Sequence, residues 1–211
     1  MRDVFLRPVI AVPFIITINI AVFIAWYVSQ VGDPDLIFMR DNFLVSWDGL
    51  AEGRYWTLLT SAFSHNMFLH IFINMYVLQS FGSILEKLLG FTRFIRLYLF
   101  AALVGSISHC VVSKFLLEEP QLPALGASGA IAGLILVFSL LFPRQKIYLL
   151  GVIPLSAIWG AFAFIGLDLW GLWSQVQGGG LPIGHGAHLG GALGGFLYYL
   201  RLRHRFRQPW A

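Results

Sequence analysis

Long apolar runs alternate with short polar segments along nearly the whole chain. The runs cover about residues 8–31, 66–86, 92–117, 128–142, 147–172 and 185–200. A helix needs about 20 apolar residues to cross a bilayer. The pattern therefore predicts an all-α membrane protein with six transmembrane helices. We expect a single domain over residues 1–211, with 8–200 as its six-span core.

The composition agrees with this pattern. Hydrophobic residues make up 58% of the chain and charged residues only 11%, whereas soluble domains carry about 25% charged residues. No cleavage site of small residues precedes the first run, so we expect it to be retained as a helix. The single cysteine, Cys110, excludes an internal disulfide.

Charged residues divide between the two sides of these runs. Basic residues flank one side, and because such residues mark cytoplasmic loops, we expect both termini there: a short N-terminal segment (1–7) and a basic tail (201–211). We expect the membrane to be the bacterial cytoplasmic (inner) membrane. We call the opposite, outer side the acidic side. One side holds Arg2, Arg7, Lys87, Arg93, Arg96, Arg144, Lys146, Arg201, Arg203, Arg205 and Arg207, and the acidic side holds Arg40, Arg54 and Lys114 against Asp33, Asp35, Asp41, Asp48, Glu52, Glu118 and Glu119.

The loop at about 32–65 on the acidic side is long and rich in aromatic and charged residues. This mixture is typical of a structured element in the membrane interface, although ordinary anchoring by an aromatic belt would also account for each aromatic. Its aromatic residues are Phe38, Phe43, Trp47, Tyr55 and Trp56.

The fourth run is too short to cross the bilayer fully. About 15 residues give roughly 22 Å of helix, against a hydrocarbon core of roughly 30 Å. Arg144 and Lys146 mark its basic end, so Ser128 at the other end should lie several ångströms below the surface. Irregular backbone at that depth must be packed in protein or line a water-filled cavity.

Five polar residues fall at one depth, although they are far apart in sequence. The second, fourth and sixth runs all lead away from the acidic side, so their first residues share the half of the membrane on that side. Polar groups within spans are candidates for function, but each alone is more often an interhelical hydrogen-bonding group. We keep that ordinary interpretation for Asp168 and His109. The five residues at one depth are His70, Asn74, Ser128, His185 and His188.

Small residues follow the fourth and sixth runs at four-residue spacing. Gly129 and Gly133 lie in the fourth run, and Gly186, Gly190 and Gly194 lie in the sixth. This spacing allows helix backbones to approach closely, which a short serine side chain needs in order to reach an imidazole. Packing alone would also account for these glycines.

These residues permit acyl-transfer chemistry. Ser128 is the candidate nucleophile, and a histidine at the same depth is the candidate base. Free N–H groups of the first helical turn, with His70 and Asn74, could stabilise an oxyanion. We expect a Ser-His dyad, because the sequence places no acidic residue within reach of the histidine. Other kinds of intramembrane protease are not favoured, because HExxH, which would bind zinc, is absent and Asp168 has no second intramembrane aspartate as a partner. We expect no metal and no other cofactor.

Three motifs together resemble the rhomboid family of intramembrane serine proteases. The resemblance runs from about residue 50 to 200 and rests on GRYWTLLTSAFSHNMFLHIFINMYVLQSFG (53–82), LGASGAIAG (125–133) and HGAHLGGALGG (185–195). The wording NMYVLQSFG and AHLGGALGG is most similar to the subgroup that includes mitochondrial rhomboids. That subgroup carries an extra leading span, which we do not expect here.

The resemblance implies roles for individual residues. It implies Ser128 as nucleophile, His188 as base, and His70 and Asn74 as oxyanion stabilisers beside the Ser128 amide. Gly126 and Gly129 would allow the tight turn around the serine, His65 would position a loop or retain water near the mouth, and His185 would be a hydrogen-bonding group there. These roles concern His65, His70, Asn74, Gly126, Ser128, Gly129, His185 and His188.

Two positions depart from the family pattern. Ala132 stands where many members have an aromatic that packs under the catalytic histidine, and Thr57 stands where many have an arginine. We expect support for His188 from elsewhere, and either Arg54 in place of the missing arginine or a different anchor for the loop.

The function expected from the sequence is intramembrane hydrolysis of peptide bonds in or near the transmembrane segments of other proteins. Its expected partners are transmembrane substrates and the lipid bilayer, with no nucleic acid, and the oligomeric state is left open. The main alternative is a catalytically inactive rhomboid-like factor that binds membrane proteins. A channel or transporter would need polar residues through the other half of the membrane, which the sequence does not provide.

Overall fold

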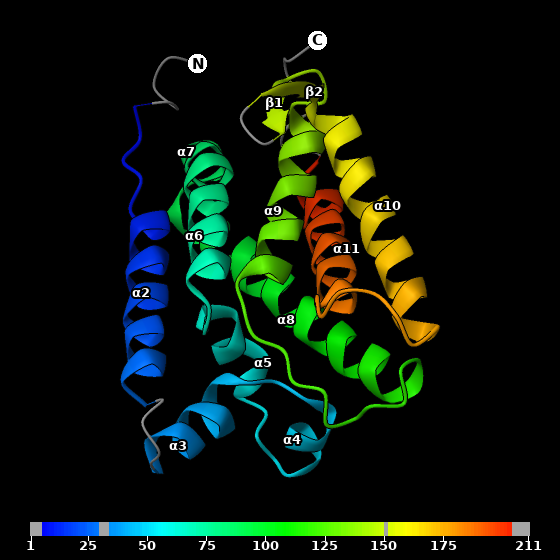
Figure 1. Cartoon of the computed structure of the whole chain (residues 1–211). Coiled ribbons are helices and arrows are strands. Elements are labelled where there is room, and N and C mark those ends of the chain that lie inside the picture. Colours follow the sequence, from blue (N-terminus) through cyan, green and yellow to red (C-terminus); the bar gives the residue numbers. More distant parts are fainter. Residues whose placement is uncertain (1–5, 30–33, 150–151, 204–211) are drawn as a thin grey trace.

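The computed structural model describes residues 6–29, 34–149 and 152–203 as a bundle of helices (Figure 1). Arg2, Asp33, Arg205 and Arg207 lie outside the described residues. An antiparallel hairpin of β1 (Lys146–Leu149) and β2 (Ile153–Ser156) joins α9 to α10. The predicted all-α membrane class is confirmed. The helices are α2 (Ala11–Ser29), α3 (Pro34–Phe43), α4 (Trp47–Ala51), α5 (Thr57–Thr60), η1 (Ser61–Phe63), α6 (Phe68–Val77), η2 (Leu78–Gly82), α7 (Ser83–Leu89), α8 (Phe91–Phe115), α9 (Ser128–Leu141), α10 (Ala157–Val176) and α11 (His185–Leu202).

Each of the six apolar runs contains a helix, but the helices are not equally suited to cross a bilayer. Among the described residues, four are long and apolar enough: α2, the continuous rod 68–89, α8 and α10. α9 has only 14 residues, as the sequence predicted. α11 has 18 residues but is rich in glycine. The count of six spans therefore stays a prediction.

The predicted start of the fifth span at residue 147 is wrong. Residues 146–149 and 153–156 form the two strands of the hairpin, with Ile147 opposite Leu155 and Tyr148 opposite Pro154, and α10 begins only at Ala157. Pro154 has no backbone N–H for a helix interior, and isoleucine and tyrosine favour strands. The hairpin packs on α10, because the Ile147 side chain fills the space beside Gly160. The run is apolar throughout, but its first residues favour strands and only the residues from Ala157 onward form a helix.

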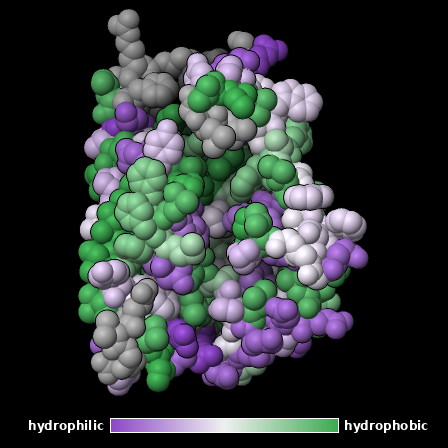
Figure 2. All heavy atoms as spheres, viewed as in Figure 1, coloured by the Kyte–Doolittle hydropathy of each residue, from purple (hydrophilic) through white to green (hydrophobic). Residues whose placement is uncertain are grey.

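Large apolar side chains cover the flanks of the bundle. In Figure 2 they form the green surface over α2 and α6 on the left, whereas hydrophilic residues gather toward α4 and the neighbouring loops at the bottom. This distribution fits a protein whose solvent is lipid along its flanks and water at its ends. Highly exposed members include Phe14 and Ile24 on α2, Phe72 and Tyr76 on α6, and Trp159, Phe162, Trp170 and Trp173 on α10.

Three helices, α8, α9 and α11, pack so closely that glycine is required between them. A Cβ on Gly133 of α9 would lie 2.7 Å from the Gly191 carbonyl oxygen of α11 and 2.6 Å from Cβ of Ala101 on α8. A Cβ on Gly105 of α8 would lie 2.9 Å from the carbonyl oxygen of Ala187. Such distances are shorter than real Cβ contacts. The predicted close approach of the fourth and sixth spans is therefore confirmed.

The second span carries a structural residue that the sequence analysis overlooked. Its α-helix widens into the π-helical turn η2 before continuing as α7. Glu86 of α7 is buried and accepts backbone hydrogen bonds from Ile10 (2.8 Å) and Ala11 (2.7 Å) at Oε1 and from Val12 (2.9 Å) at Oε2. A carboxylate here satisfies free N–H groups at the start of α2 and favours the positive end of that helix. Glu86 thus ties the first and second spans together.

The long loop on the acidic side is structured, as predicted. It folds into α3, α4, α5 and η1. The Arg54 guanidinium forms ion pairs with Asp41 of α3 and with Glu52, each at 2.8 Å. Thr57 is buried, and its hydroxyl donates to the Arg54 carbonyl at 2.6 Å. Arg54 therefore anchors the loop, which is the first of the two arrangements that the sequence left open.

Candidate active site

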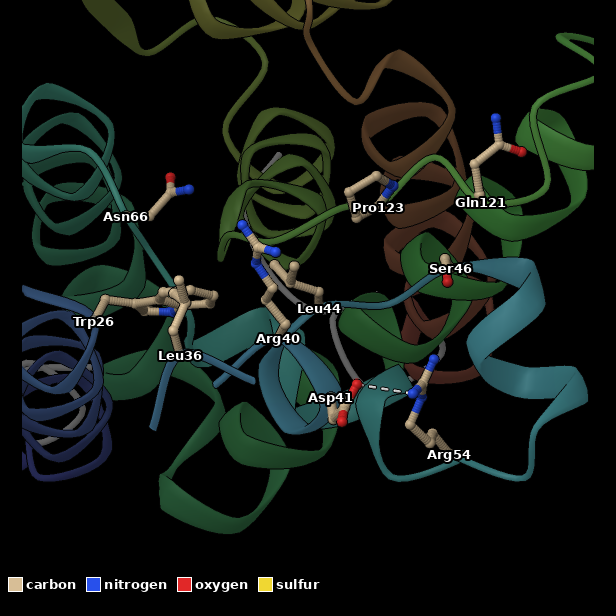
Figure 3. A pocket seen from close by; sticks show the side chains of 10 residues that line it. All are labelled: Trp26, Leu36, Arg40, Asp41, Leu44, Ser46, Arg54, Asn66, Gln121 and Pro123. Carbon is tan, nitrogen blue, oxygen red and sulfur yellow. Dashed lines mark hydrogen bonds and ion pairs between the residues drawn. The ribbon is translucent and has the colours of Figure 1, made fainter. Parts of the chain in front are cut away.

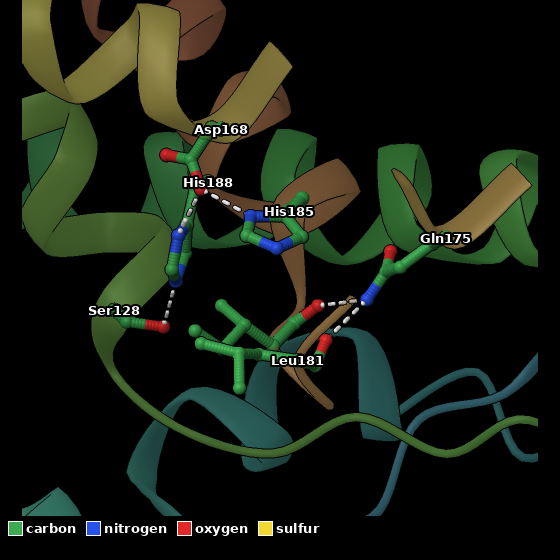
Figure 4. A network of polar contacts seen from close by, with 7 residues as sticks. Ser128, Asp168, Gln175, Leu181, His185 and His188 are labelled. Carbon is green, nitrogen blue, oxygen red and sulfur yellow. Dashed lines mark hydrogen bonds and ion pairs between the residues drawn. The ribbon is translucent and has the colours of Figure 1, made fainter. Parts of the chain in front are cut away.

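Ser128 and His188 are in direct contact. Ser128 is the first residue of α9, His188 lies in the first turn of α11, and the Ser128 Oγ is 2.8 Å from the His188 Nε2 (Figure 4). The close packing of α9 on α11 makes this possible, because Gly129 follows the serine and its Cα faces the Ala187 carbonyl. A serine hydroxyl at this distance from an imidazole is the arrangement of an activated nucleophile.

An acidic residue lies beside His188, on the side away from Ser128, contrary to the sequence prediction. The Asp168 Oδ1 on α10 lies 3.0 Å from the His188 Nδ1. The expectation that no acidic residue would be within reach is wrong. Asp168 is an interhelical hydrogen-bonding group, as expected, but the expectation that it has no partner at its depth is wrong, because it contacts both histidines of α11. The side chain of Asp168 is buried, so its charge acts in a medium of low polarity.

His185 contacts the same carboxylate rather than the serine. Its Nδ1 lies 2.7 Å from the Asp168 Oδ1, and Figure 4 shows its ring pointing away from Ser128. The prediction that His188 and not His185 faces the nucleophile agrees with this geometry. Asp168, His185 and His188 have donor atoms within 4.8 Å of one another, so these three side chains could together bind a metal ion. An ion there would have to displace both hydrogen bonds to Asp168.

Phe164 supplies the aromatic support that the sequence could not find. Ala132 leaves no aromatic at the family position, yet the Phe164 ring from α10 stacks on the His188 ring, with centroids 5.5 Å apart and planes at 29°. Phe164 lies four residues before Asp168, and residues four apart share one helix face. One face of α10 therefore presents both a ring and a carboxylate to His188.

The backbone before Ser128 is held by the first loop. Val45 and Ala124 exchange two backbone hydrogen bonds of 2.9 and 2.8 Å, and the Gly126 N–H donates to the Ser61 carbonyl at 2.9 Å. The His109 Nε2 donates to the Leu122 carbonyl at 3.0 Å. His109 is thus a hydrogen-bonding group, but its partner lies in the loop between α8 and α9 and not on another helix, as the sequence had led us to expect. The irregular backbone is thus packed in protein, as its depth required.

His65 fixes the residue next to the nucleophile. Its Nε2 accepts from the Ala127 N–H at 3.3 Å and from the Asn74 Nδ2 at 3.1 Å. Because Nε2 accepts, the ring proton is on Nδ1. Burial, with a smaller contribution from nearby His70, lowers the pKa of His65 to about 3. His65 is therefore neutral, and of its two suggested roles, loop positioning is the one its contacts support.

The expected oxyanion residues, His70 and Asn74, lie beside this loop. Gly126 has a φ of +124°, and a Cβ there would lie 2.7 Å from the His70 ring, so only glycine fits between His70 and the backbone. Asn74 uses its amide nitrogen for His65 and for the His70 carbonyl (3.0 Å). A role for Asn74 in binding an oxyanion stays a prediction, and it requires one of these bonds to be exchanged. Ser128 and Gly129 lie in the first turn of α9, where backbone N–H groups have no acceptor within the helix.

Gln175 at the end of α10 holds the loop before His185. Its Nε2 donates to the carbonyls of Leu181 (2.9 Å) and Ile183 (2.8 Å) (Figure 4).

A pocket of about 630 Å³ lies on the acidic side (Figure 3). Ser128 and His188 are not among its lining residues, which are Trp26, Leu36, Arg40, Asp41, Leu44, Ser46, Arg54, Asn66, Gln121 and Pro123.

Comparisons with known proteins match this geometry. The family model of the rhomboid domain matches residues 52–205. The chain belongs to the rhomboid family. This rhomboid is 35% identical over 98% of its length to RHOMBOID-like protein 12, mitochondrial, of Arabidopsis thaliana, and covers 60% of that protein. It is 36% identical over 86% of its length to Rhomboid protein 1, mitochondrial, of Saccharomyces cerevisiae, and covers 50% of it. It is 31% identical over 70% of its length to Rhomboid protease GluP of Bacillus subtilis, and covers 26% of it.

The relatives also correct the expected location. This rhomboid spans about half the length of the mitochondrial relatives it matches. Because these relatives are mitochondrial proteins, the expected bacterial cytoplasmic membrane is wrong. The charge pattern behind that expectation separates the two sides of a membrane, but it carries no information on which membrane holds the chain.

Proposed function

We propose that this rhomboid is a serine endopeptidase that hydrolyses peptide bonds in or near the transmembrane segments of other membrane proteins. The observation that carries the proposal is the 2.8 Å contact between the Ser128 Oγ and the His188 Nε2 at the first residue of the short helix α9. A relative is named a rhomboid protease, which agrees with this proposal.

The chemistry proceeds in two steps. The Ser128 Oγ attacks the peptide carbonyl carbon, and its proton passes to the His188 Nε2. The C–N bond then breaks, that proton goes to the leaving nitrogen, and the acyl group remains on the Ser128 oxygen. Water adds to the acyl carbon while Nε2 takes its proton, and the ester bond breaks to return Ser128 as a hydroxyl. Backbone N–H groups at the start of α9 would stabilise the oxyanion in both steps.

The depth of Ser128 suggests the class of substrate. A peptide bond must be in an extended or unwound segment to reach the serine, because helical backbone hydrogen bonds shield it. We therefore propose single-span proteins with small or helix-breaking residues near the acidic side of the membrane as substrates. Such residues lower the cost of unwinding a helix within the bilayer.

A fluorophosphonate probe with a fluorescent tag tests the proposal directly, since it reacts with activated serines. We expect folded protein in detergent to be labelled, Ser128→Ala to be unlabelled, and His188→Ala to lose labelling by about 10³-fold or more. Ser139→Ala is the matched control: Ser139 lies on the same helix, is buried, and has no hydrogen-bond partner for its hydroxyl among the described residues. We expect it to label like the wild type.

Co-expression with candidate single-span proteins, followed by mass spectrometry of the fragments, locates the cut. Cleavage should depend on Ser128 and should fall near the acidic side of the substrate span. Folded wild-type protein that neither labels nor cleaves would contradict the proposal and favour an inactive binding factor. Cleavage lost in His185→Ala but retained in His188→Ala would overturn the assignment of the base.

A further inference from the structure

We propose that Asp168 and His185 form a positioning unit that holds His188 in its reactive orientation, so that the site works as a row of four side chains rather than a Ser-His pair. The inference rests on the proposed function and deepens it. The row runs from His185 through Asp168 and His188 to Ser128, over three contacts of 2.7, 3.0 and 2.8 Å.

The contacts fix the tautomer of His188. An ionised carboxylate can only accept hydrogen bonds, so the Nδ1 of both His185 and His188 must donate to the Asp168 Oδ1. A neutral His188 with its proton on Nδ1 has its lone pair on Nε2, which faces the Ser128 hydroxyl. This is the tautomer that can take the serine proton. With the other tautomer, Nε2–H would point at the serine and no proton could be transferred.

His185 stabilises the Asp168 carboxylate, which fixes the tautomer of His188. Asp168 is 4% exposed, and its Oδ2 has no hydrogen-bond partner among the described residues. A buried charge requires hydrogen-bonded partners, and the two imidazoles supply them here. While Ser128 attacks, the proton from its Oγ resides on the His188 Nε2 and makes an imidazolium. His185 keeps Asp168 oriented toward that charge without entering the reaction itself.

The packing of α10 on α11 indicates a built arrangement. Phe164, Asp168 and Gly171 are spaced at i, i+4 and i+7, so they lie along one face of α10. Phe164 stacks on the ring of His188. Gly171 leaves room for the ring of His185, since any Cβ there would overlap the His185 imidazole. A larger residue at Gly171 would push His185 away from Asp168.

The decisive variant is Asp168→Asn. Asp35→Asn, at an exposed residue of α3, is the control for loss of one carboxylate. Labelling by the fluorophosphonate is measured over a range of probe concentrations, which separates the maximal rate of labelling from the half-saturating concentration. We expect Asp168→Asn to lower the maximal rate by about 10²–10⁴-fold, the scale on which serine proteases depend on the orienting aspartate. The half-saturating concentration should stay within about twofold, because the buried Asp168 does not contact the probe.

His185 provides a second pair of variants that does not remove the buried charge. Asparagine places an amide nitrogen near the position of Nδ1 and keeps the donor, whereas leucine of similar size removes it. We expect His185→Leu to lower the maximal rate about tenfold and His185→Asn to restore most of it. If Asp168→Asn does not fold, this pair decides the question.

The outcomes separate the two proposals. If the wild type shows no Ser128-dependent labelling, the proposed function fails and the positioning unit fails with it. If the wild type labels and Asp168→Asn labels as fast as Asp35→Asn, only the positioning unit is overturned. Equal maximal rates for His185→Leu and His185→Asn would likewise remove His185 from the unit. If Asp168→Asn raised the half-saturating probe concentration and left the maximal rate unchanged, the positioning role would be overturned.

Discussion

Replacing Gly133 by alanine should disconnect Ser128 from His188 without changing either residue. Gly133 lies on α9, and its added Cβ would sit 2.7 Å from the Gly191 carbonyl oxygen on α11. Ordinary van der Waals contact begins near 3.4 Å, so α11 would have to move by about 0.7 Å. Ala101 on α8, at 2.6 Å, blocks the opposite direction.

The displacement is large compared with the tolerance of the site. A shift of about 0.7 Å would lengthen the 2.8 Å contact between Ser128 and His188 to about 3.5 Å, beyond a good hydrogen bond. Misplacement by about 1 Å costs on the order of 10²-fold in rate, so we expect labelling by the fluorophosphonate to slow by about 10–100-fold. Overpacking of this kind also lowers the free energy of unfolding by about 1–3 kcal/mol.

The assay combines the labelling rate with the thermal unfolding temperature in detergent. Gly166→Ala is the matched control, because Gly166 is an exposed residue of α10 and an added Cβ there meets nothing within 4 Å. We expect it to label at the wild-type rate and to be stabilised by up to about 1 kcal/mol, since alanine is the better helix former. If Gly133→Ala labels and unfolds like Gly166→Ala, the helices accommodate the methyl group, and glycine packing does not set the distance between nucleophile and base.

Two further predictions follow from residues around the site. Phe164→Leu should lower the maximal labelling rate about three- to tenfold, because His188 loses its stacked ring, whose contact is worth about 0.5–1.5 kcal/mol; Phe164→Tyr should retain the rate, and equal loss in both would contradict a stacking role. His65, with a pKa of about 3 in the folded protein, binds a proton only after unfolding between about pH 6.5 and 3. Its contribution to stability is therefore lost as the pH falls from 6.5, by up to about 1.4 kcal/mol per pH unit. Unfolding temperatures at pH 7 and pH 5 should show a smaller drop in His65→Gln than in the wild type, and identical drops would refute this.

The sequence predicted the helices better than their connections. Apolar runs identify membrane spans because burying backbone in lipid demands helices, and the short fourth span and the folded first loop both appear in the structure. The sequence did not predict the hairpin before α10, because the hydropathy of Ile147 and Ile153 is the same in a strand as in a helix. Pro154 was the available signal that a helix could not pass through this segment.

The hydrogen-bond partners of residues around the reacting pair are harder to predict from the sequence than the pair itself. Ser128 and His188 are expected at one depth, and they are 2.8 Å apart. Asn74 is expected at the same depth, but its amide contacts His65 and is not directed at the serine. Competition among nearby acceptors is decided by distances of a few tenths of an ångström, which spacing along a sequence does not contain.

The direction of the fifth span explains why Asp168 lies at the depth of the two histidines. The second, fourth and sixth spans begin on the acidic side, so their first residues were compared with one another. The fifth span runs the opposite way, so its last residues lie in that same half of the membrane. Asp168 lies eight residues before the last residue of α10 and contacts the first turn of α11, which follows a loop of only eight residues, 177–184. A short loop makes consecutive helices antiparallel neighbours, so an acidic residue late in one span and histidines early in the next should be paired. The spacing of Asp168 from His185 and His188 therefore predicts their contact, and a polar residue in an odd-numbered span should be compared with the even-numbered spans from its far end.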